Sequence, residues 1–215
     1  VIATIAGSLM LLLGQHWSPV LDTAIAQLPE RGGLIEGRLQ WPDSQSGTLA
    51  GNQFLRIIVD PKGEQQHGQI ADFQVELRSE SWVVGSIFGY AEFPYALETF
   101  HIDRKKQIPW WGSRRPFLLI GISLSIGLIY GVVSLLLGFV GIWPSKTVAF
   151  FSDRQGGTGP LFRLSTAAWF PPGALLSTGS LCYALNLLPL MGLLSLIPLY
   201  FLVGWVYLFF SPFFL

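Results

Sequence analysis

Residues 164–215 read LSTAAWFPPGALLSTGSLCYALNLLPLMGLLSLIPLYFLVGWVYLFFSPFFL and contain no Asp, Glu, Lys, Arg or His. An uncharged and mostly apolar stretch of 52 residues is not typical of a surface that faces water. One helical crossing of a bilayer takes about 20 apolar residues. The stretch therefore predicts two membrane crossings. We expect the turn between them at residues 186–189, where Asn186 and Pro189 interrupt the apolar run.

The composition of the whole chain also indicates a membrane protein. Of its 215 residues, 51% are hydrophobic and 12% are charged, whereas soluble domains are about 25% charged. Twelve of the 13 acidic residues and ten of the 13 basic residues precede Pro116. The chain is thus expected to have a polar first half and a membrane-embedded second half. Its net charge of zero does not favour nucleic acid as a partner.

Residues 108–215 are predicted to form a transmembrane region of three helices, over 117–142, 162–188 and 190–210. Pro171-Pro172-Gly173 interrupts the second of these. Either an interfacial segment precedes a helix that starts at Pro171, or one long helix kinks there. We expect a flexible loop over 144–160, because its glycine cluster lacks the lysine of a phosphate-binding loop.

Residues 1–16 are predicted to be the end of a first transmembrane helix. The first 13 residues are apolar throughout, but a helix of that length rises only about 20 Å, against a hydrocarbon core of roughly 30 Å. We therefore expect this helix to be truncated, with its beginning upstream of Val1. Ser18 and Pro19 then predict a new helix start, with Ser18 as the N-cap.

That new helix, within residues 17–33, is expected to be amphipathic. Its apolar side chains recur on one face, at Leu21, Ile25 and Leu28. The helix either lies along the membrane interface or covers a small neighbouring domain.

Residues 34–107 predict a small antiparallel β-rich domain. Four strands are expected, at 34–41, 54–60, 70–78 and 82–90. The third alternates strictly, and we expect its apolar side chains to face the core and its polar ones to face water. The core-facing set is Ala71, Phe73, Val75 and Leu77, and the water-facing set is Asp72, Gln74, Glu76 and Arg78. The predicted fold is therefore an integral membrane protein, mainly α-helical, with about four transmembrane helices and the β-rich domain between the first two.

Two sets of residues in and near the predicted spans have expected roles. Tryptophans and arginines at membrane edges favour the interface, which predicts anchors at Trp17, Trp110, Trp111, Arg114, Arg115 and Trp143. Small residues four apart let helix backbones approach closely, which predicts a helix-packing stripe of Ser123, Gly127, Gly131, Ser134 and Gly138.

The sequence offers little chemistry, and we expect no catalytic, cofactor-binding or metal site. The interiors of the predicted spans carry no ionisable residue, which disfavours a proton pump or an ion-coupled transporter. His16, His67, His101 and Cys182 have no ligand partner at metal-site spacing.

We therefore expect a non-catalytic accessory subunit of a larger bacterial-type membrane complex. Its expected partners are membrane lipids and other transmembrane subunits. The alternative is a transporter or lipid-handling protein that uses the proline-broken third helix, with Ser177, Thr178, Ser180 and Asn186 as its polar lining. The basic residues of the short loop (Lys146, Arg154 and Arg163) favour an inner-membrane protein whose β-rich domain is extracytoplasmic.

Overall fold

The structure is a computed structural model. It describes residues 1–30, 32–42, 46–63, 68–96, 99–102, 104–154 and 157–214. The chain divides into two compact units. One is a helical unit of Val1–Leu12 and Ile120–Leu215, and the other is a β-rich unit of Leu13–Leu119.

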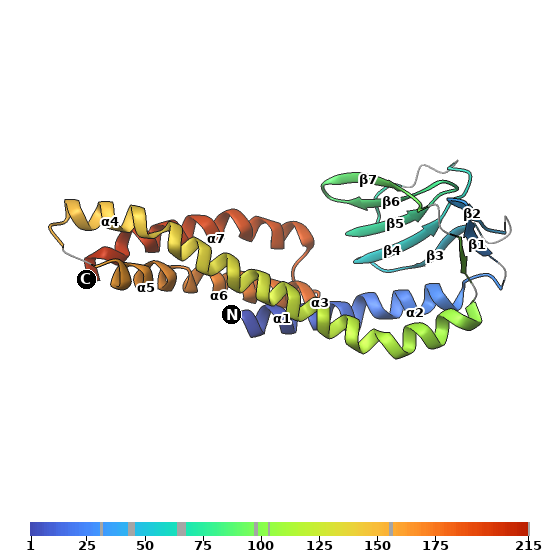
Figure 1. Ribbon diagram of the computed structural model, residues 1–215, viewed down its shortest axis with the longest axis horizontal. Coiled ribbons are helices and arrows are strands. Elements are labelled where there is room, and N and C mark those ends of the chain that lie inside the picture. Colours follow the sequence, from blue (N-terminus) through green and yellow to red (C-terminus); the bar gives the residue numbers. More distant parts are fainter. Residues whose placement is uncertain are drawn as a thin grey trace. The chain divides into compact units, whose positions relative to one another are not determined.

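The helical unit consists of helices that pack side by side (Figure 1). Helix α1 packs against α6, α6 packs against α7, and α4 and α5 pack against each other and against α7. The helices are α1 (Ile2–Leu11), the later part of α3 (Arg104–Val140), α4 (Ile142–Phe151), α5 (Thr158–Ala168), α6 (Phe170–Ala184) and α7 (Leu190–Phe210), followed by a 3-10 helix (Ser211–Phe214).

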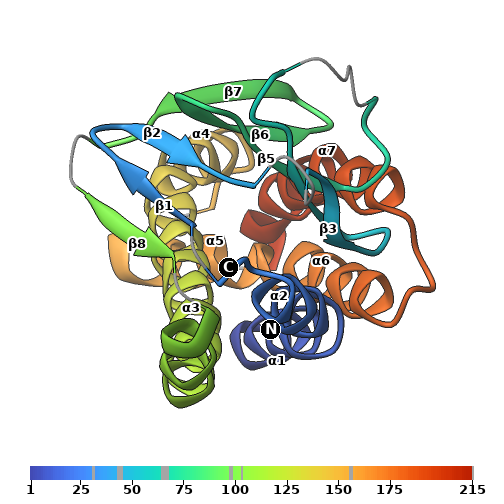
Figure 2. The ribbon, with the colours of Figure 1, turned by 90° about the vertical axis from the view of Figure 1, so that its right-hand side faces the viewer.

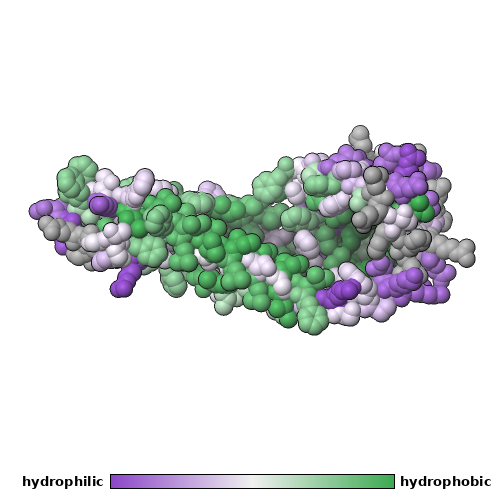
Figure 3. All heavy atoms as spheres, in the orientation of Figure 1, coloured by the Kyte–Doolittle hydropathy of each residue, from purple (hydrophilic) through white to green (hydrophobic). Residues whose placement is uncertain are grey.

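Two helical segments are long and apolar enough to cross a membrane: Arg104–Phe151, which joins α3 and α4, and Leu190–Phe213. In the most hydrophobic 18 residues of Arg104–Phe151, only 11% are buried within the protein. In the corresponding stretch of Leu190–Phe213, only 17% are buried. In Figure 3 the helical unit is covered mostly by hydrophobic residues, while hydrophilic ones gather where α4 leads to α5. A core helix of a soluble protein would instead be mostly buried.

The helix boundaries differ from the predicted ones at three places. Helix α3 begins at Arg104 rather than at residue 117. The predicted loop over 144–160 is wrong for its first half, because α4 runs to Phe151; Pro144 lies in its first turn, where a missing N–H costs little. The predicted helix 162–188 is two helices, α5 and α6, which are separated at Trp169, and the prolines lie in the first turn of α6. The turn at Asn186 is confirmed, with Asn186 at a φ of 61°.

Helix α2 begins at Ser18 as predicted, but the expected N-cap role of Ser18 is wrong, because Trp17 precedes it in helical conformation and Ser18 Oγ makes no hydrogen bond within the described residues. Helix α1 continues through a π-helical segment (Leu12–Trp17) directly into α2 (Ser18–Ala26). Trp17, at the expected boundary, has helical backbone angles, with φ −83° and ψ −41°. Pro19, which has no N–H to donate, follows the π-helical segment directly, in the first turn of α2.

The β-rich unit contains two sheets (Figures 1 and 2). The smaller sheet is antiparallel, with strand order β2-β1-β8. The larger has the order β3-β4-β5-β6-β7 and is mixed, because β4 and β5 are parallel, so the expected purely antiparallel domain is corrected. The strands are β1 (Gly32–Ile35), β2 (Arg38–Gln40), β3 (Gly47–Gly51), β4 (Leu55–Val59), β5 (Phe73–Leu77), β6 (Ser81–Ser86), β7 (Gly89–Pro94) and β8 (Phe100–Ile102).

Two of the predicted strands are in fact hairpins. The first turns at Glu36 and Gly37, whose φ values of 51° and 76° match a tight two-residue turn. The second turns before Gly89, whose φ is 112°. Strands β3 and β8 were not predicted, because β3 begins and ends with glycine and β8 is only three residues long.

Helix α2 packs against β3 and β4, so the amphipathic helix covers a sheet of its own unit. The β-rich unit has a hydrophobic core formed by α2 and the strands. Partly exposed side chains at the edge of this core include Trp17, Val75 and Leu77. The buried members of the core are Val20, Ala24, Leu39, Trp41, Leu49, Ala50, Leu55 and Val59.

The predicted facing of β5 is wrong for Phe73 and for the polar side chains Gln74 and Glu76. Ala71, in contrast, is buried, and Val75 and Leu77 pack on the core as expected. Phe73 is 38% exposed, whereas Gln74 is 1% exposed and Glu76 is 4% exposed. Strand β5 lies in the middle of its sheet, and the face that carries Gln74 and Glu76 is buried, so the alternation does not mark a wet side. Glu76 accepts a hydrogen bond of 2.8 Å from Nε of Arg78, and this contact raises the pKa of Arg78.

The burial of the polar side chain of Gln74 lowers the stability of the folded protein. Neither its Oε1 nor its Nε2 makes a hydrogen bond within the described residues. An unpaired buried amide costs about 1–3 kcal/mol. We therefore expect Gln74→Met, which keeps the shape of the side chain, to raise the free energy of unfolding by about 1 kcal/mol, as measured by thermal unfolding in detergent. The same change at the exposed Gln27 should leave stability unaltered. A fall in stability for Gln74→Met would show that the amide has a partner.

Candidate functional site

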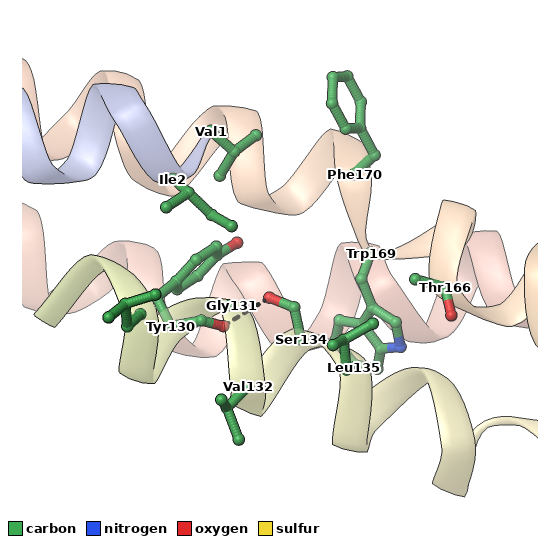
Figure 4. Close-up of a pocket in the computed structure, with 11 residues that line it drawn as sticks. Val1, Ile2, Tyr130, Gly131, Val132, Ser134, Leu135, Thr166, Trp169 and Phe170 are labelled. Atoms are coloured by element: carbon green, nitrogen blue, oxygen red, sulfur yellow. Dashed lines mark hydrogen bonds between the residues drawn. The ribbon is translucent and has the colours of Figure 1, made fainter. Parts of the chain in front are cut away.

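The helical unit contains a pocket of about 450 Å³ between four of its helices. Figure 4 shows side chains from α1, α3, α5 and α6 around it. The lining residues are Val1, Ile2, Leu128, Tyr130, Gly131, Val132, Ser134, Leu135, Thr166, Trp169 and Phe170.

The surface of the pocket is almost entirely carbon. The hydroxyl of Ser134 donates a hydrogen bond of 2.9 Å to the carbonyl oxygen of Tyr130 (Figure 4). The donor of Ser134 is therefore already used within α3. Thr166 Oγ1 and Trp169 Nε1 are buried and make no hydrogen bond within the described residues. None of the lining side chains is charged. Such a pocket is suited to hydrocarbon rather than to polar groups.

Trp169 forms a rigid wall of this pocket at the break between α5 and α6. The residue is only 4% exposed. Its ring lies 5.4 Å from that of Tyr200 and 6.2 Å from that of Phe201, both on α7. Gly204, also on α7, leaves the room that the indole occupies, because a Cβ there would lie 2.6 Å from Cε3 of Trp169.

The predicted helix-packing stripe lies against α1 and α5 of this same chain. A Cβ at Gly127 would lie 3.4 Å from Cβ of Ala6, and one at Gly131 would lie 3.0 Å from Cδ1 of Ile2. Gly138 lies against Thr166. The other two members are Ser123, which is buried, and Ser134, which lines the pocket.

Several predicted membrane anchors make contacts inside the β-rich unit. Trp111 donates from Nε1 to Oδ1 of Asp22, at 2.6 Å, and Nη1 of Arg115 lies 2.9 Å from Oδ2 of the same carboxylate. These contacts join α2 to the first part of α3. Trp17 packs its ring edge-on against Phe73, at 5.5 Å.

The remaining two anchors of this segment form a surface pair. The guanidinium of Arg114 lies 4.7 Å from the ring centre of Trp110, which is a cation–π contact. Trp143, on α4, is exposed. These three side chains remain available for the interface role that the sequence predicts.

The other residues that the sequence singles out do not line the pocket. His16 lies with its ring 4.2 Å from that of Phe54, and its carbonyl accepts a hydrogen bond from Asn52. Cys182 is a free, partly buried thiol. His67 and the side chain of His101 lie outside the described residues. Within the described part of the chain, no group of three His, Cys, Asp or Glu residues could hold a metal ion.

Three of the four polar residues expected to line a site at the broken helix hydrogen-bond to their own helix instead, and the fourth, Asn186, lies in the turn after α6. Ser177 and Thr178 donate to the carbonyl of Ala174, and Ser180 donates to that of Leu176, all at 2.9–3.0 Å. The actual lining includes Tyr130, Leu135 and Trp169, which no sequence pattern predicted as site residues. The one sequence feature near these residues that indicated a special site was the pair Pro171-Pro172, which follows the break between α5 and α6 at Trp169.

Comparison of the chain with protein-family models, with curated proteins and with solved structures finds no match.

Proposed function

We propose that this chain is an integral membrane protein that handles lipids by binding a hydrocarbon chain in the pocket between α1, α3, α5 and α6. The observation that supports this proposal is the lining, which is concave, carbon-rich and uncharged. The pocket's 450 Å³ lies within the range of about 300–1,000 Å³ that is usual for ligand pockets. Leu128, Val132 and Leu135 line it and are also exposed, so the pocket opens on the apolar surface of the helices.

The proposed membrane arrangement has about four crossings, by α1, α3, the α5–α6 pair and α7. The support comes from the low burial of the two longest apolar segments. Apolar side chains as exposed as these are stable in lipid but costly in water. We place the β-rich unit on the extracytoplasmic side of a bacterial-type inner membrane, since Lys146 and Arg154 lie in or near the connection of α4 to α5.

The pocket favours binding over catalysis. General acid–base chemistry needs a titratable side chain within reach of the reacting atoms. The lining holds no Asp, Glu, His, Lys, Arg or Cys side chain, and its one titratable side chain is the phenol of Tyr130. We therefore propose that the chain holds or passes on a lipid without altering it.

A pair of neighbouring leucines on α3 tests this proposal. Leu135 is 55% exposed and lines the pocket, whereas Leu136 is 58% exposed and does not. Leu135→Trp should fill the pocket and lower the amount of lipid retained after purification at least about tenfold, a change of roughly 1.4 kcal/mol in binding free energy. Leu136→Trp should leave it unchanged. Native mass spectrometry of the detergent-purified protein measures the bound lipid directly.

The result that would contradict the proposal is equal lipid retention by the two variants and the unaltered protein. In that case any associated lipid would belong to the general apolar surface and not to the pocket. Because both substitutions place the same side chain on an exposed part of α3, a difference between them reports on the pocket and not on expression or insertion.

The edge strand β7 favours a second candidate function, that of an accessory subunit of a membrane complex. All six of its residues are exposed, and within the described part of the unit it pairs only with β6. Phe88, Tyr90 and Phe93 add exposed aromatic rings along this hairpin. An exposed edge of this kind can pair with a strand of another protein. Co-purification of other subunits in mild detergent would support this second proposal.

A further inference from the structure

We infer that the turn between β6 and β7 inserts into the lipid interface of the membrane and anchors the β-rich unit at its surface. The inference goes beyond the proposed function, because it rests on the proposed membrane crossing by α3 and not on the pocket. We call this turn, which consists of Ile87 and Phe88, the hairpin tip. Phe88 is 85% exposed, and a phenyl ring is more stable in lipid than in water.

The hairpin around the tip is uncharged and its turn is internally bonded. Residues 81–91 include no Asp, Glu, Lys, Arg or His. The backbone N–H of Phe88 donates a hydrogen bond of 3.3 Å to Oγ of Ser86. Tyr90, which follows on β7, is 57% exposed, and its amphipathic ring suits a membrane interface. The tip can therefore enter a lipid surface without bringing a charge or the Phe88 N–H unpaired into it.

The hairpin tip projects from the end of the larger sheet that contacts the beginning of α2. Strand β5 begins with Phe73 beside the last residue of β6, so the tip extends past Phe73. The ring of Phe73 lies 5.5 Å from that of Trp17. Strand β4 begins at the same end, where the side chain of Asn52 donates a hydrogen bond of 2.7 Å to the carbonyl of His16. From this side of the unit the chain leads back to the uncharged residues 1–13.

Helix α3 leaves the β-rich unit on this side as well. At its start, Nη1 of Arg104 donates a hydrogen bond of 3.2 Å to the carbonyl of Ala26. Further along, Arg115 binds Asp22, which comes earlier in α2. Helix α3 therefore runs antiparallel to α2 and continues from Asp22 towards Trp17. The uncharged stretch 116–145 begins directly after Arg115, so the proposed crossing starts on the side that carries the hairpin tip.

The opposite end of the sheet is charged. Glu80, between β5 and β6, lies 3.1 Å from Nη2 of Arg38, and both side chains are largely exposed. This contrast favours lipid at one end of the sheet and water at the other. Two projecting side chains cover much less than the roughly 800 Å² that each partner buries in a stable protein interface. A unit that is already tethered through two helices, in contrast, needs little additional area to stay at a lipid surface.

The insertion has to be shallow. Asp72 precedes Phe73 and is therefore level with Ile87, and a carboxylate is costly within hydrocarbon. A strand rises about 3.3 Å per residue, so the hairpin tip extends only a few ångströms past Asp72. Each headgroup layer of a bilayer is roughly 5–8 Å thick. The ring of Phe88 can thus reach the edge of the hydrocarbon while Asp72 stays among the headgroups.

An environment-sensitive fluorophore at position 88 tests the inference on the 215-residue protein in vesicles of equal parts phosphatidylcholine and phosphatidylglycerol. Phe88→Cys is labelled after Cys182→Ser has removed the native thiol, and Glu80→Cys is the matched control at the charged end. We expect lipid with a spin-label quencher near its headgroup to lower the fluorescence at 88 about twofold or more, since interfacial side chains lie about 5–10 Å into the headgroup boundary. The label at 80 should respond only to a water-soluble quencher.

The outcomes separate this inference from the proposed function. A label at 88 that only the water-soluble quencher reaches overturns the inference. A label that neither quencher reaches shows that the hairpin tip packs against protein, and it overturns the inference too. Equal lipid retention by Leu135→Trp and Leu136→Trp, together with lipid quenching at 88, overturns the pocket alone. If the protein does not float with the vesicles, both proposals are overturned.

Two substitutions at Phe88 test whether its ring anchors the tip, with the label moved to Ile87→Cys. Phe88→Asp places a charge at the interface and should reduce lipid quenching at 87 to the level of the control at 80. Phe88→Leu should retain the quenching. Because Phe88 is so exposed, neither change is expected to disturb the fold. Equal lipid quenching in the two variants would show that Phe88 is not the anchor and would overturn the inference.

Discussion

Gly204→Leu is expected to lower the free energy of unfolding by about 3 kcal/mol, near the upper end of the usual cost of overpacking, and to abolish lipid binding. A Cβ at this position would lie 2.6 Å from Cε3 and 2.9 Å from Cη2 of Trp169. The indole is rigid and almost fully buried, so it cannot yield as a flexible side chain would. The helices have to separate, or Trp169 has to move out of its position and distort the pocket.

Unfolding of the purified protein with increasing sodium dodecyl sulphate, followed by circular dichroism, measures the first effect, and native mass spectrometry measures the second. Val206→Leu is the control, because Val206 is exposed on the same helix. Unaltered stability and lipid retention in Gly204→Leu would mean that α7 does not pack on Trp169 as the structure shows.

Gly127→Leu is expected to cost about 2–3 kcal/mol by forcing α1 away from α3. A Cβ at Gly127 would lie 3.4 Å from Cβ of Ala6 and 3.7 Å from the backbone oxygen of Ile2. The remaining atoms of a leucine side chain have no room there. Because Ile2 also lines the pocket, movement of α1 should weaken lipid binding too.

Helix α3 provides the matched control for this substitution. A Cβ at Gly121 would have nothing within 4 Å, so Gly121→Leu makes the same chemical change on the same helix without a clash. The same two measurements apply, and Gly121→Leu should behave as the unaltered protein. If both variants lose stability equally, the loss reflects a general intolerance of α3 to leucine and not the contact with α1.

Features that depend on one continuous stretch could be predicted from the sequence. The uncharged residues 164–215 predicted two apolar membrane-spanning segments. Helix α7 (Leu190–Phe210) has the bounds predicted for the second of them. Asn186, which tolerates a positive φ, marked the turn before it. Composition and local backbone preference are sufficient for such features, since the residues that decide them are neighbours in the chain.

The tertiary structure alone decided the facing of β5, the binding of Asp22 by Trp111 and Arg115, and the pocket itself. In β5 a regular alternation predicted one wet face, yet Gln74 and Glu76 on that face are buried. The pocket is lined by residues as far apart in the chain as Ile2, Leu135 and Trp169. Periodicity reports which side chains of one element share a face, but what covers that face depends on elements that are distant in sequence, and that information is absent from any single stretch.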